Sequence, residues 1–316
     1  MSEYKPPYTL TSKMLLLVSE ISEMITEVSM IKREISAPIL RKKNRVRSIT
    51  GSLQIEGNTL SEEEVTALIE GKRVIGTVRE IEEVKGAIKA YEEIERYDPK
   101  SLDDLLLAHK LMMGSLLENA GAFRSGNVGI YGKDGVSHVA PPPYRVPELM
   151  SELFGWLKET KEHPLISSSI FHYEFEFIHP FSDGNGRIGR LWQSVILGHY
   201  RKIFFCIPIE SVVKEHQKAY YEALEKAGSA GESTLFVEFM LTSIHLAVKR
   251  FLKEYNKSDQ KILNLMQQDN TITIKELMLR LDMSESGIKK VIRKLKKEGK
   301  ITRIGSAKGG HWEVME

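Results

Sequence analysis

The chain has 316 residues, of which 41% are hydrophobic, so it is long enough for two or three domains and can bury a sizeable core. Its net charge of +2 gives the chain as a whole no strong attraction to nucleic acids or membranes. The single cysteine, Cys206, excludes a disulfide framework, indicates a reducing compartment, and is interpreted as a buried small residue within the apolar run IFFCIPI.

The amino-terminal segment MSEYKPPYTL does not resemble a signal peptide, because it is polar and contains two prolines. The longest apolar runs, such as MLLLV at residues 14–18, are too short to span a bilayer. We therefore expect the protein in the cytoplasm.

Most of the chain up to residue 255 is predicted to be helical, because apolar residues recur at spacings of three and four. In the first predicted helix this pattern runs through Met14, Leu17 and Ile21. Ser61 and Glu64 form a capping box that marks the start of the second. The predicted helices cover about 13–49, 61–93, 102–118, 146–160, 166–178, 187–202, 210–227 and 232–255.

Residues 121–146 differ from the helical regions because they are rich in glycine and proline. Residues 128–131 and 136–140 are predicted to pair as two strands around a glycine-containing turn at 132–135. The three prolines that follow end this hairpin.

The last segment, residues 258–316, is predicted to form a separate domain. Its predicted order of helix, short strand, two helices and two strands is that of a winged helix-turn-helix domain, a geometry that reads the major groove of DNA. Residues 252–316 contain 14 Lys and Arg against 9 Asp and Glu, so the tail is modestly basic. The predicted elements are a helix at 259–267, a short strand at 271–274, helices at 275–281 and 284–298, and strands at 300–305 and 310–315.

The run HPFSDGNGRIGR, residues 179–190, is predicted to be an anion-binding loop followed by a helix. Gly184 and Gly186 allow successive backbone N–H groups to point into one concavity, and the helix N-terminus adds further donors. Arg187 and Arg190 lie three residues apart and therefore share one face of that helix. Two guanidinium groups beside such a nest suit a phosphate group.

Three further residues of this loop have chemistry that suits a bound phosphate. Asp183 is the only acid of the loop, and Mg²⁺ often binds one or two carboxylates together with phosphate oxygens. His179 is placed to remove a proton from an incoming hydroxyl group. Asn185 either hydrogen-bonds a phosphate oxygen or holds the loop.

Taken together, these residues resemble the signature of the Fic family, His-x-Phe-x-Asp/Glu-Gly-Asn-Gly-Arg-x-x-Arg, with no departure at any fixed position. The resemblance extends over about 100–250, where GAFRSGNVGIY and VAPPPYRVPELM are similar to the family's flap hairpin, and PIESVVKEHQKAYYEAL to its helix on the adenine side. It implies that the protein uses ATP with Mg²⁺ and transfers AMP to a Ser, Thr or Tyr hydroxyl of a target protein, with release of pyrophosphate.

The resemblance also implies a role for each matching residue. His179 is expected to be the catalytic general base and Asp183 the ligand of Mg²⁺, with Asn185 near the α-phosphate and Arg190 near the γ-phosphate. The residues expected to bind the nucleotide are Asp183, Gly184, Asn185, Gly186, Arg187, Ile188, Gly189, Arg190, Val128, Gly129, Ile130, Tyr131, Tyr220 and Tyr221.

Tyr220 and Tyr221 are expected to approach the base or ribose, although packing within a helix explains them equally well. Gly228 departs from the family pattern, because some relatives have an Asn at this position. The contact that this Asn makes in those relatives is therefore in doubt for this chain.

A second short run, SLQIEGN at residues 52–58, resembles the inhibitory helix found in one class of the family. Ser52 and Glu56 match its pattern, four residues apart on one helical face. Glu56 is expected to pair with Arg190 and thereby to occupy the arginine meant for the γ-phosphate. The resemblance therefore implies an autoinhibited enzyme whose inhibitory residues are on the same chain.

The expected fold class is mainly α: an all-α Fic-type helical core with a small β-hairpin flap, followed by a C-terminal winged helix-turn-helix domain. The N-terminal region is expected at 1–99, with the inhibitory helix at about 48–58. The catalytic core is expected at 100–250 and the winged-helix domain at 258–316.

Other functions remain open at this point. The lysine-rich predicted helix at 284–298 suits either DNA binding or the docking of a protein, and a DNA-binding regulator could use the nucleotide pocket only as a sensor. The same site could remove AMP from a target or transfer another phosphate-containing group. Family relatives often dimerise, which leaves a homodimer open.

Overall fold

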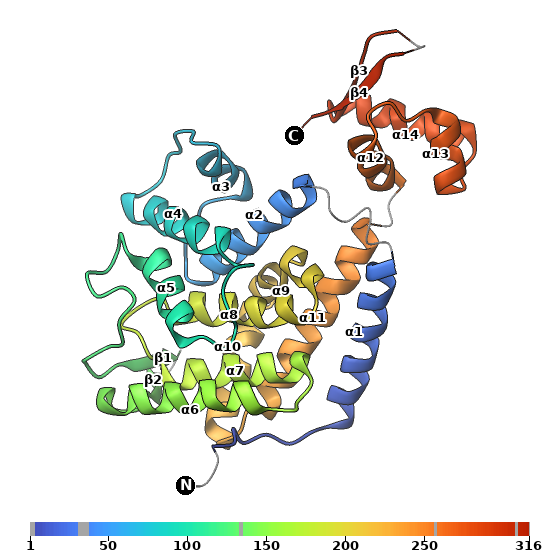
Figure 1. Ribbon diagram of the computed structural model, residues 1–316. Coiled ribbons are helices and arrows are strands. Elements are labelled where there is room, and N and C mark those ends of the chain that lie inside the picture. Colours follow the sequence, from blue (N-terminus) through green and yellow to red (C-terminus); the bar gives the residue numbers. More distant parts are fainter. Residues whose placement is uncertain (1–3, 31–37, 133–134, 256–257, 307–308, 316) are drawn as a thin grey trace. The chain divides into compact units, whose positions relative to one another are not determined.

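The computed structural model of the chain describes residues 4–30, 38–132, 135–255, 258–306 and 309–315. Helices dominate these ranges (Figure 1). The α-helices are α1 (Ser12–Met30), α2 (Pro38–Ile55), α3 (Glu62–Ile69), α4 (Val78–Glu92), α5 (Leu102–Met113), α6 (Val146–Glu159), α7 (Pro164–Ile178), α8 (Asn185–Tyr200), α9 (Ile209–Glu215), α10 (Gln217–Ala230), α11 (Thr234–Tyr255), α12 (Ser258–Gln268), α13 (Ile274–Leu281) and α14 (Glu285–Lys297). Short 3₁₀ helices span Pro143–Arg145 and Lys202–Cys206.

The chain divides into two compact units. The first comprises residues 1–22 and 44–247, and the second comprises residues 23–43 and 248–316. The predicted mainly α fold with a small hairpin and a C-terminal winged helix is confirmed. The predicted boundaries at 99/100 and 250/258 remain predictions.

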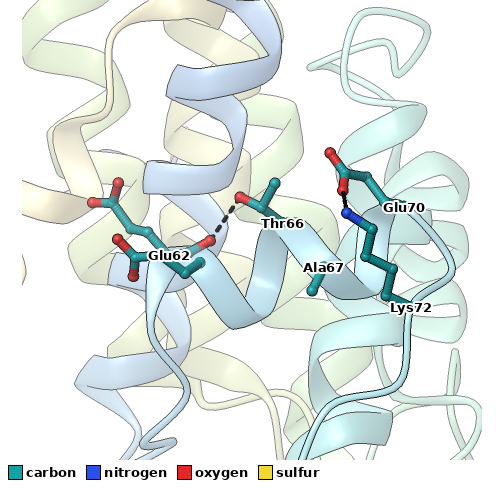
Figure 2. A pocket seen from close by; sticks show the side chains of 6 residues that line it. Glu62, Thr66, Ala67, Glu70 and Lys72 are labelled. Atoms are coloured by element: carbon teal, nitrogen blue, oxygen red, sulfur yellow. Dashed lines mark hydrogen bonds and ion pairs between the residues drawn. The ribbon is translucent and has the colours of Figure 1, made fainter. Parts of the chain in front are cut away.

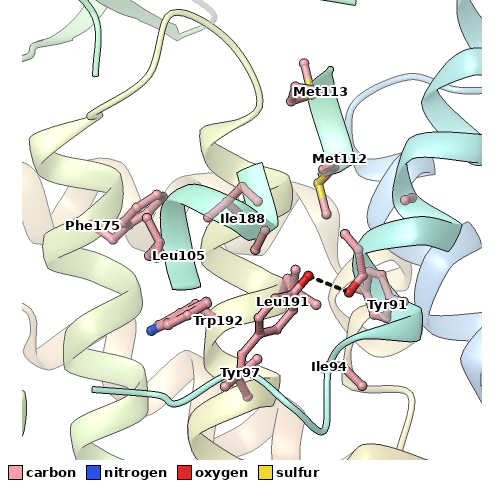
Figure 3. Packing of buried hydrophobic residues seen from close by; sticks show 14 of the residues in the cluster. Tyr91, Ile94, Tyr97, Leu105, Met112, Met113, Phe175, Ile188, Leu191 and Trp192 are labelled. Carbon is pink, nitrogen blue, oxygen red and sulfur yellow. Dashed lines mark hydrogen bonds between the residues drawn. The ribbon is translucent and has the colours of Figure 1, made fainter. Parts of the chain in front are cut away.

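The core of the first unit forms around α7 and α8, which pack against each other. Nearly every residue of both helices is buried, including several polar and charged ones, so each helix is covered on almost all sides. Trp192 of α8 is fully buried between Tyr97 and Phe154, and its indole N–H donates to the carbonyl of Pro99 at 3.1 Å. Figure 3 shows α5, α7 and α8 converging on this cluster. This packing fixes the two helices that flank the loop at 179–184.

Two predicted helices are each split in two by local signals that the apolar pattern did not reveal. The predicted block at 61–93 is α3 and α4, because Thr77 and Glu80 form a second capping box. The predicted helix at 210–227 breaks at His216 into α9 and α10. The predicted helix at 102–118 ends earlier, at Met113. The predicted helix at 13–49 corresponds to α1 and part of α2, with residues 31–37 outside the described ranges.

The predicted hairpin is present. Strand β1 (Gly129–Gly132) pairs antiparallel with β2 (Gly135–Val139), and the register shifts between Ile130 and Tyr131. The two residues at the tip of the turn, 133–134, lie outside the described ranges.

The second unit contains the winged helix: α12, α13 and α14, followed by the antiparallel strands β3 (Ile301–Ile304) and β4 (His311–Val314). The strand predicted at 271–274 does not form, because Thr273 is the N-cap of α13 and accepts from the N–H of Glu276. Instead, Trp312 of β4 reaches back to this segment, and its indole N–H donates to the carbonyl of Ile272 at 3.0 Å. This contact closes the small core of the domain.

Gly86→Ala is expected to lower the free energy of unfolding by on the order of 2 kcal/mol or more. A Cβ at Gly86 would overlap the backbone carbonyl of Met112, where α4 packs against α5, and neither backbone can move freely. The midpoint of urea denaturation measures this effect.

Gly155→Ala on α6 is the matched control, because a Cβ there would meet no heavy atom within 4 Å. It is expected to raise stability by up to about 1 kcal/mol through helix propensity alone. Equal midpoints for the two variants would contradict the close approach of α4 and α5.

Candidate active site

The loop at 179–184 begins where α7 ends, in an unusual backbone conformation. His179 has a left-handed backbone with φ of 51°, which costs a residue with a side chain about 1 kcal/mol or more. The conformation is held by hydrogen bonds: the N–H of His179 donates to Phe175, and its carbonyl accepts from Nε of Arg124 at 2.7 Å. Arg124, which is 3% exposed and was not predicted, therefore positions the loop.

Asn185 holds the other end of the loop. Its side-chain oxygen accepts from the N–H of Phe181 and its amide nitrogen donates to the carbonyl of Phe181, both at 2.9 Å. Gly184 before it has φ of 87°, a value that glycine adopts without strain. The sequence left two roles open for Asn185, and these two hydrogen bonds correspond to the role of holding the loop. Its predicted place near a phosphate stays a prediction.

The imidazole of His179 is oriented by α7. Its Nδ1 lies 3.4 Å from the carbonyl oxygen of Glu176, and its side chain is 23% exposed. In the Nδ1–H tautomer, the ring proton would point to this carbonyl and Nε2 would carry the lone pair. This is the orientation that a general base requires.

Arg190 is buried and surrounded by acceptors from the end of α2. Its Nε donates to the hydroxyl of Ser52 at 3.1 Å, and its Nη2 donates to the carbonyl of Ser52 at 3.0 Å and to Oε1 of Glu56 at 2.7 Å. The predicted pairing of Glu56 with Arg190 is thus present in the structure. Burial lowers the pKa of Arg190, but Glu56, Tyr220 and Glu176 together outweigh it and raise this pKa above its ordinary value.

Gly186 leaves room for this ion pair. A Cβ at Gly186 would lie 2.5 Å from Oε1 of Glu56 and 3.0 Å from Nη1 of Arg190. A side chain at this position would therefore compete with the glutamate for the same space. The glycine predicted for an anion nest also determines how closely Glu56 can approach α8.

Arg187 is the second buried arginine of the signature, with 3% of its side chain exposed. Its Nη2 donates to Oδ1 of Asp183 at 2.9 Å, and its Nη1 lies 3.4 Å from Oε1 of Glu83. Neither Nε nor Nη1 has a hydrogen-bond partner among the described residues. A buried guanidinium with unused donors is suited to receive an anion.

Asp183 is shared between two arginines. Besides the bond from Arg187, its Oδ2 lies 3.3 Å from Nη2 of Arg79, which comes from α4 and was not predicted. The described residues contain no group of three or more His, Cys, Asp or Glu that could hold a metal ion. Because Asp183 is one carboxylate, 40% exposed, it fits Mg²⁺ only as a cation whose remaining ligands are phosphate oxygens and water.

The two predicted tyrosines lie in different environments. Tyr220 is 1% exposed, and its hydroxyl lies 3.1 Å from Nε2 of His172, whose Nδ1 lies 2.8 Å from Oε1 of Gln193. Tyr221 is 46% exposed and donates to the carbonyl of Ile55 at 3.3 Å. The contacts of Tyr220 are those of packing within the core. The predicted approach of both residues to the base or ribose remains a prediction.

The predicted flap residues are described only in part. Val128 is half-buried, and Gly129, Ile130 and Tyr131 lie on strand β1. The side chains of 129–139 lie outside what the structure describes. Ile188 and Gly189 are buried in the first turns of α8, where Gly189 allows close approach of Glu176 and His172.

Glu176 is a buried acid that the sequence did not reveal, because it precedes the signature. Its Oε1 has no hydrogen-bond partner among the described residues. Burial, with Glu56 adding to it and Arg190 opposing it, raises the pKa of Glu176 to about 8. Next to it, burial lowers the pKa of His172 to about 3, so this histidine is neutral.

An open hollow of about 350 Å³ lies along α3, as Figure 2 shows. None of its residues belongs to the predicted site. It is lined by Glu62, Glu63, Thr66, Ala67, Glu70 and Lys72, and Lys72 pairs with Glu70 at 2.6 Å. Its predominantly acidic lining does not suit a phosphate ligand.

Comparison with known proteins agrees with this geometry. Residues 99–197 match the Fic/DOC family, and residues 255–302 match a winged helix-turn-helix DNA-binding family. The crystal structure of a Fic family protein from Desulfovibrio desulfuricans G20 aligns with 99% of this chain and 98% of its own, at 40% identity and a TM-score of 0.77. The chain therefore belongs to the Fic family.

The curated relatives are longer proteins. The protein adenylyltransferase Fic of Culex quinquefasciatus is 31% identical over 210 residues, which are 63% of this chain and 40% of that protein. The chain thus spans about two fifths of the length of this relative. The structure of Fic-1 from Caenorhabditis elegans, 23% identical and with a TM-score of 0.60, covers 77% of this chain and 75% of its own and shows the shared fold.

The melting temperature of Glu176→Gln, relative to that of the wild type, is expected to rise as pH increases from 5 to 8.5. The pKa of Glu176 is raised by folding from 4.5 to about 8, so its stabilising contribution is complete below about pH 4.5 and is lost as pH rises through 8. The variant cannot ionise and escapes this loss. At pH 8.5 its melting temperature is expected to exceed that of the wild type by about 3 °C or more.

Glu152→Gln on α6 is the control, because Glu152 is exposed. Its difference in melting temperature from the wild type is expected to stay constant over the same pH range. A constant difference for Glu176→Gln as well would show that Glu176 is ionised throughout.

Proposed function

We propose that the protein transfers AMP from ATP to a Ser, Thr or Tyr hydroxyl of a target protein. The observation that carries this proposal is the pair of buried arginines, Arg187 and Arg190, on the first turns of α8, with His179 at the other end of the same loop. The relatives from mosquitoes and nematodes named protein adenylyltransferase support it.

In the proposed reaction, the oxygen of the target hydroxyl forms a bond to the α-phosphorus of ATP, and the bond from that phosphorus to the pyrophosphate oxygen breaks. Nε2 of His179 accepts the proton of the hydroxyl, and pyrophosphate leaves. Arg187 and Arg190 hold the outer phosphates, and the backbone N–H groups at the start of α8 face the negative charge. Mg²⁺ bound with Asp183 would neutralise part of the phosphate charge.

We further propose that the structure described is the inhibited state. A γ-phosphate at Arg190 and the carboxylate of Glu56 need the same guanidinium donors, and Glu56 now uses Nη2 at 2.7 Å. Residues 52–58, here called the inhibitory segment, therefore oppose the productive pose of ATP. In this proposal, the catalytic core covers residues 100–250 and the inhibitory segment precedes it on the same chain.

None of the helices in the described ranges is long and apolar enough to cross a membrane. We propose a cytoplasmic location on the basis of the single, buried Cys206. A homodimer remains part of the proposal by family resemblance alone.

A second candidate function rests on α14 of the winged helix. This helix presents Lys290, Arg293 and Lys297 as exposed cations, while Lys289 pairs with Glu285 and Lys294 with Asp259. An exposed basic face on the second helix of a helix-turn-helix unit suits the phosphates of duplex DNA. We propose that this domain binds DNA, with docking of a protein as the alternative.

The first test measures label on protein from α-labelled ATP with Mg²⁺. Glu56→Gly is expected to increase label on the protein or its target about tenfold or more, because loss of 1.4 kcal/mol of competition already gives this factor. Glu56→Gly/His179→Ala is expected to lose the label by roughly 10²–10⁴-fold, the usual contribution of a general base. Nucleotide binding by the double variant, measured by calorimetry, serves as the control for folding of the site.

Label that persists without His179 would remove this residue from its role. A Glu56→Gly variant that binds ATP like the wild type and transfers nothing would instead favour a nucleotide sensor.

The DNA-binding test uses the full chain and measures affinity for duplex DNA as a function of salt. Arg293→Ala is expected to reduce the slope of log affinity against log salt by about 0.9, the value for one phosphate contact. Arg96→Ala, an exposed arginine of the first unit that pairs with Glu93, is the matched control and should leave the slope unchanged. A slope near zero for the wild type would favour the docking of a protein.

A further inference from the structure

The C-terminal end of α2 is held by side chains from α9 and α10. Nζ of Lys214 donates to the carbonyl of Gln54 at 2.8 Å, and Nε2 of Gln217 donates to the carbonyl of Ile55 at 2.7 Å. The hydroxyl of Tyr221 donates to the same carbonyl of Ile55 at 3.3 Å. We call Lys214, Gln217 and Tyr221 the C-terminal clamp. It satisfies carbonyls that a helix end otherwise leaves without partners.

Glu56 follows these carbonyls directly, on a tight turn. The N–H of Asn58 donates to Leu53 and the N–H of Gly57 donates to Gln54, both at 3.2 Å, and Gly57 has φ of 94°. This pattern is a Schellman motif, in which a glycine in the left-handed region closes the helix. The direction of the Glu56 side chain therefore depends on where the last turn of α2 is held.

Two residues of the clamp contact each other, next to a close approach of α2 and α9. Nζ of Lys214 also donates to Oε1 of Gln217 at 2.8 Å, so the two side chains fix each other. A Cβ at Gly51 would lie 2.8 Å from the backbone nitrogen of Ser211, which shows how closely α2 approaches α9. The positive charge of Lys214 also interacts favourably with the negative end of the dipole of α2.

We propose that Lys214 and Gln217 are positioning residues of the inhibitory segment, which set how often Glu56 occupies Arg190. This inference rests on the proposed AMP transfer and its inhibition by Glu56. Among the described residues, the hydrogen bonds of these two side chains go to Gln54, to Ile55 and to each other, and none goes to the signature loop. Their effect on the reaction therefore passes through the end of α2 and Glu56.

The test measures AMP transfer by Lys214→Met and Gln217→Ala, each in the wild-type chain and in the Glu56→Gly chain. In the wild-type chain each change is expected to raise transfer about fivefold, which corresponds to about 1 kcal/mol at 1.4 kcal/mol per tenfold. In the Glu56→Gly chain neither change is expected to alter transfer, because there is no carboxylate to position. Such dependence on Glu56 cannot arise from a general loss of stability.

Lys218→Met is the matched control, since Lys218 lies on α10, is exposed, and forms an ion pair with Glu222 on the same helix. It is expected to leave transfer unchanged in both chains. Lys214→Arg keeps the charge and is expected to restore most of the inhibition that Lys214→Met loses. Equal effects of Lys214→Met with and without Glu56, or no effect in the wild-type chain while Glu56→Gly is active, would overturn the proposal.

Amide hydrogen exchange tests the positioning without catalysis. The N–H groups of Glu56, Gly57 and Asn58 are all hydrogen-bonded to carbonyls of α2, so their exchange reports the closed turn. Lys214→Met is expected to speed their exchange about fivefold, and Lys218→Met is expected to leave it unchanged. If Glu56→Gly transfers no AMP, the proposed function is wrong. If amide exchange at residues 56–58 is unchanged in Lys214→Met, the proposed role of Lys214 is wrong, whatever the outcome of the transfer assay.

Discussion

The buried charge of Arg190 is the constraint on which the rest of the site depends. Only 2% of this side chain is exposed, and an isolated buried cation is costly, so the guanidinium needs an anion at all times. Glu56 supplies that anion, and Ser52 supplies two neutral acceptors. In the proposed function, a phosphate arriving at this position has to exchange with the carboxylate. The proposed inhibition and the proposed substrate binding would then use the same guanidinium group.

Backbone geometry, together with two buried side chains, arranges the site around this ion pair. Gly186 leaves space at the first turn of α8, and Gly57 closes the last turn of α2, so two glycines set the approach of one carboxylate. On the far side of the loop, Arg124 and Asn185 secure a backbone whose conformation at His179 is strained. The loop is thus held by hydrogen bonds within the chain, and a site whose parts are already held in place avoids ordering costs during reaction.

The parts of the site that the sequence predicted are those encoded in one short run or in a known pattern. The turn at Gly184, the position of Arg187 and Arg190 on one helix face, and the hairpin all follow from local chemistry. The pairing of Glu56 with Arg190 joins residues 134 positions apart, and only the resemblance to a family made it predictable.

What the sequence did not reveal depends on burial and on contacts between distant elements. Glu176 looks like any acid on a helix until α8 and α10 cover it, and Arg124 shows no sign of its bond to the loop. The hydrogen bond from the Tyr221 hydroxyl to the carbonyl of Ile55 likewise joins two distant elements, and its predicted approach to the nucleotide stays a prediction. The break before α4 is different, since its signals were present in the sequence. They are the capping box at Thr77 and Glu80 and the two glycines at 71 and 76, and the predicted block at 61–93 passed over them.

In the proposed inhibited state, the different exposures of Glu56 and Arg190 affect how their ion pair can separate. The side chain of Glu56 is 32% exposed, so water can solvate its carboxylate as it leaves, whereas Arg190 has no such access. Departure of Glu56 alone would leave the buried guanidinium with only the neutral acceptors of Ser52. That intermediate is unfavourable because a buried charge without a counter-ion loses far more than a surface charge does. Release is therefore easiest when another anion arrives at Arg190 as Glu56 turns outward, and a loosened α2 helps by making that turn less costly.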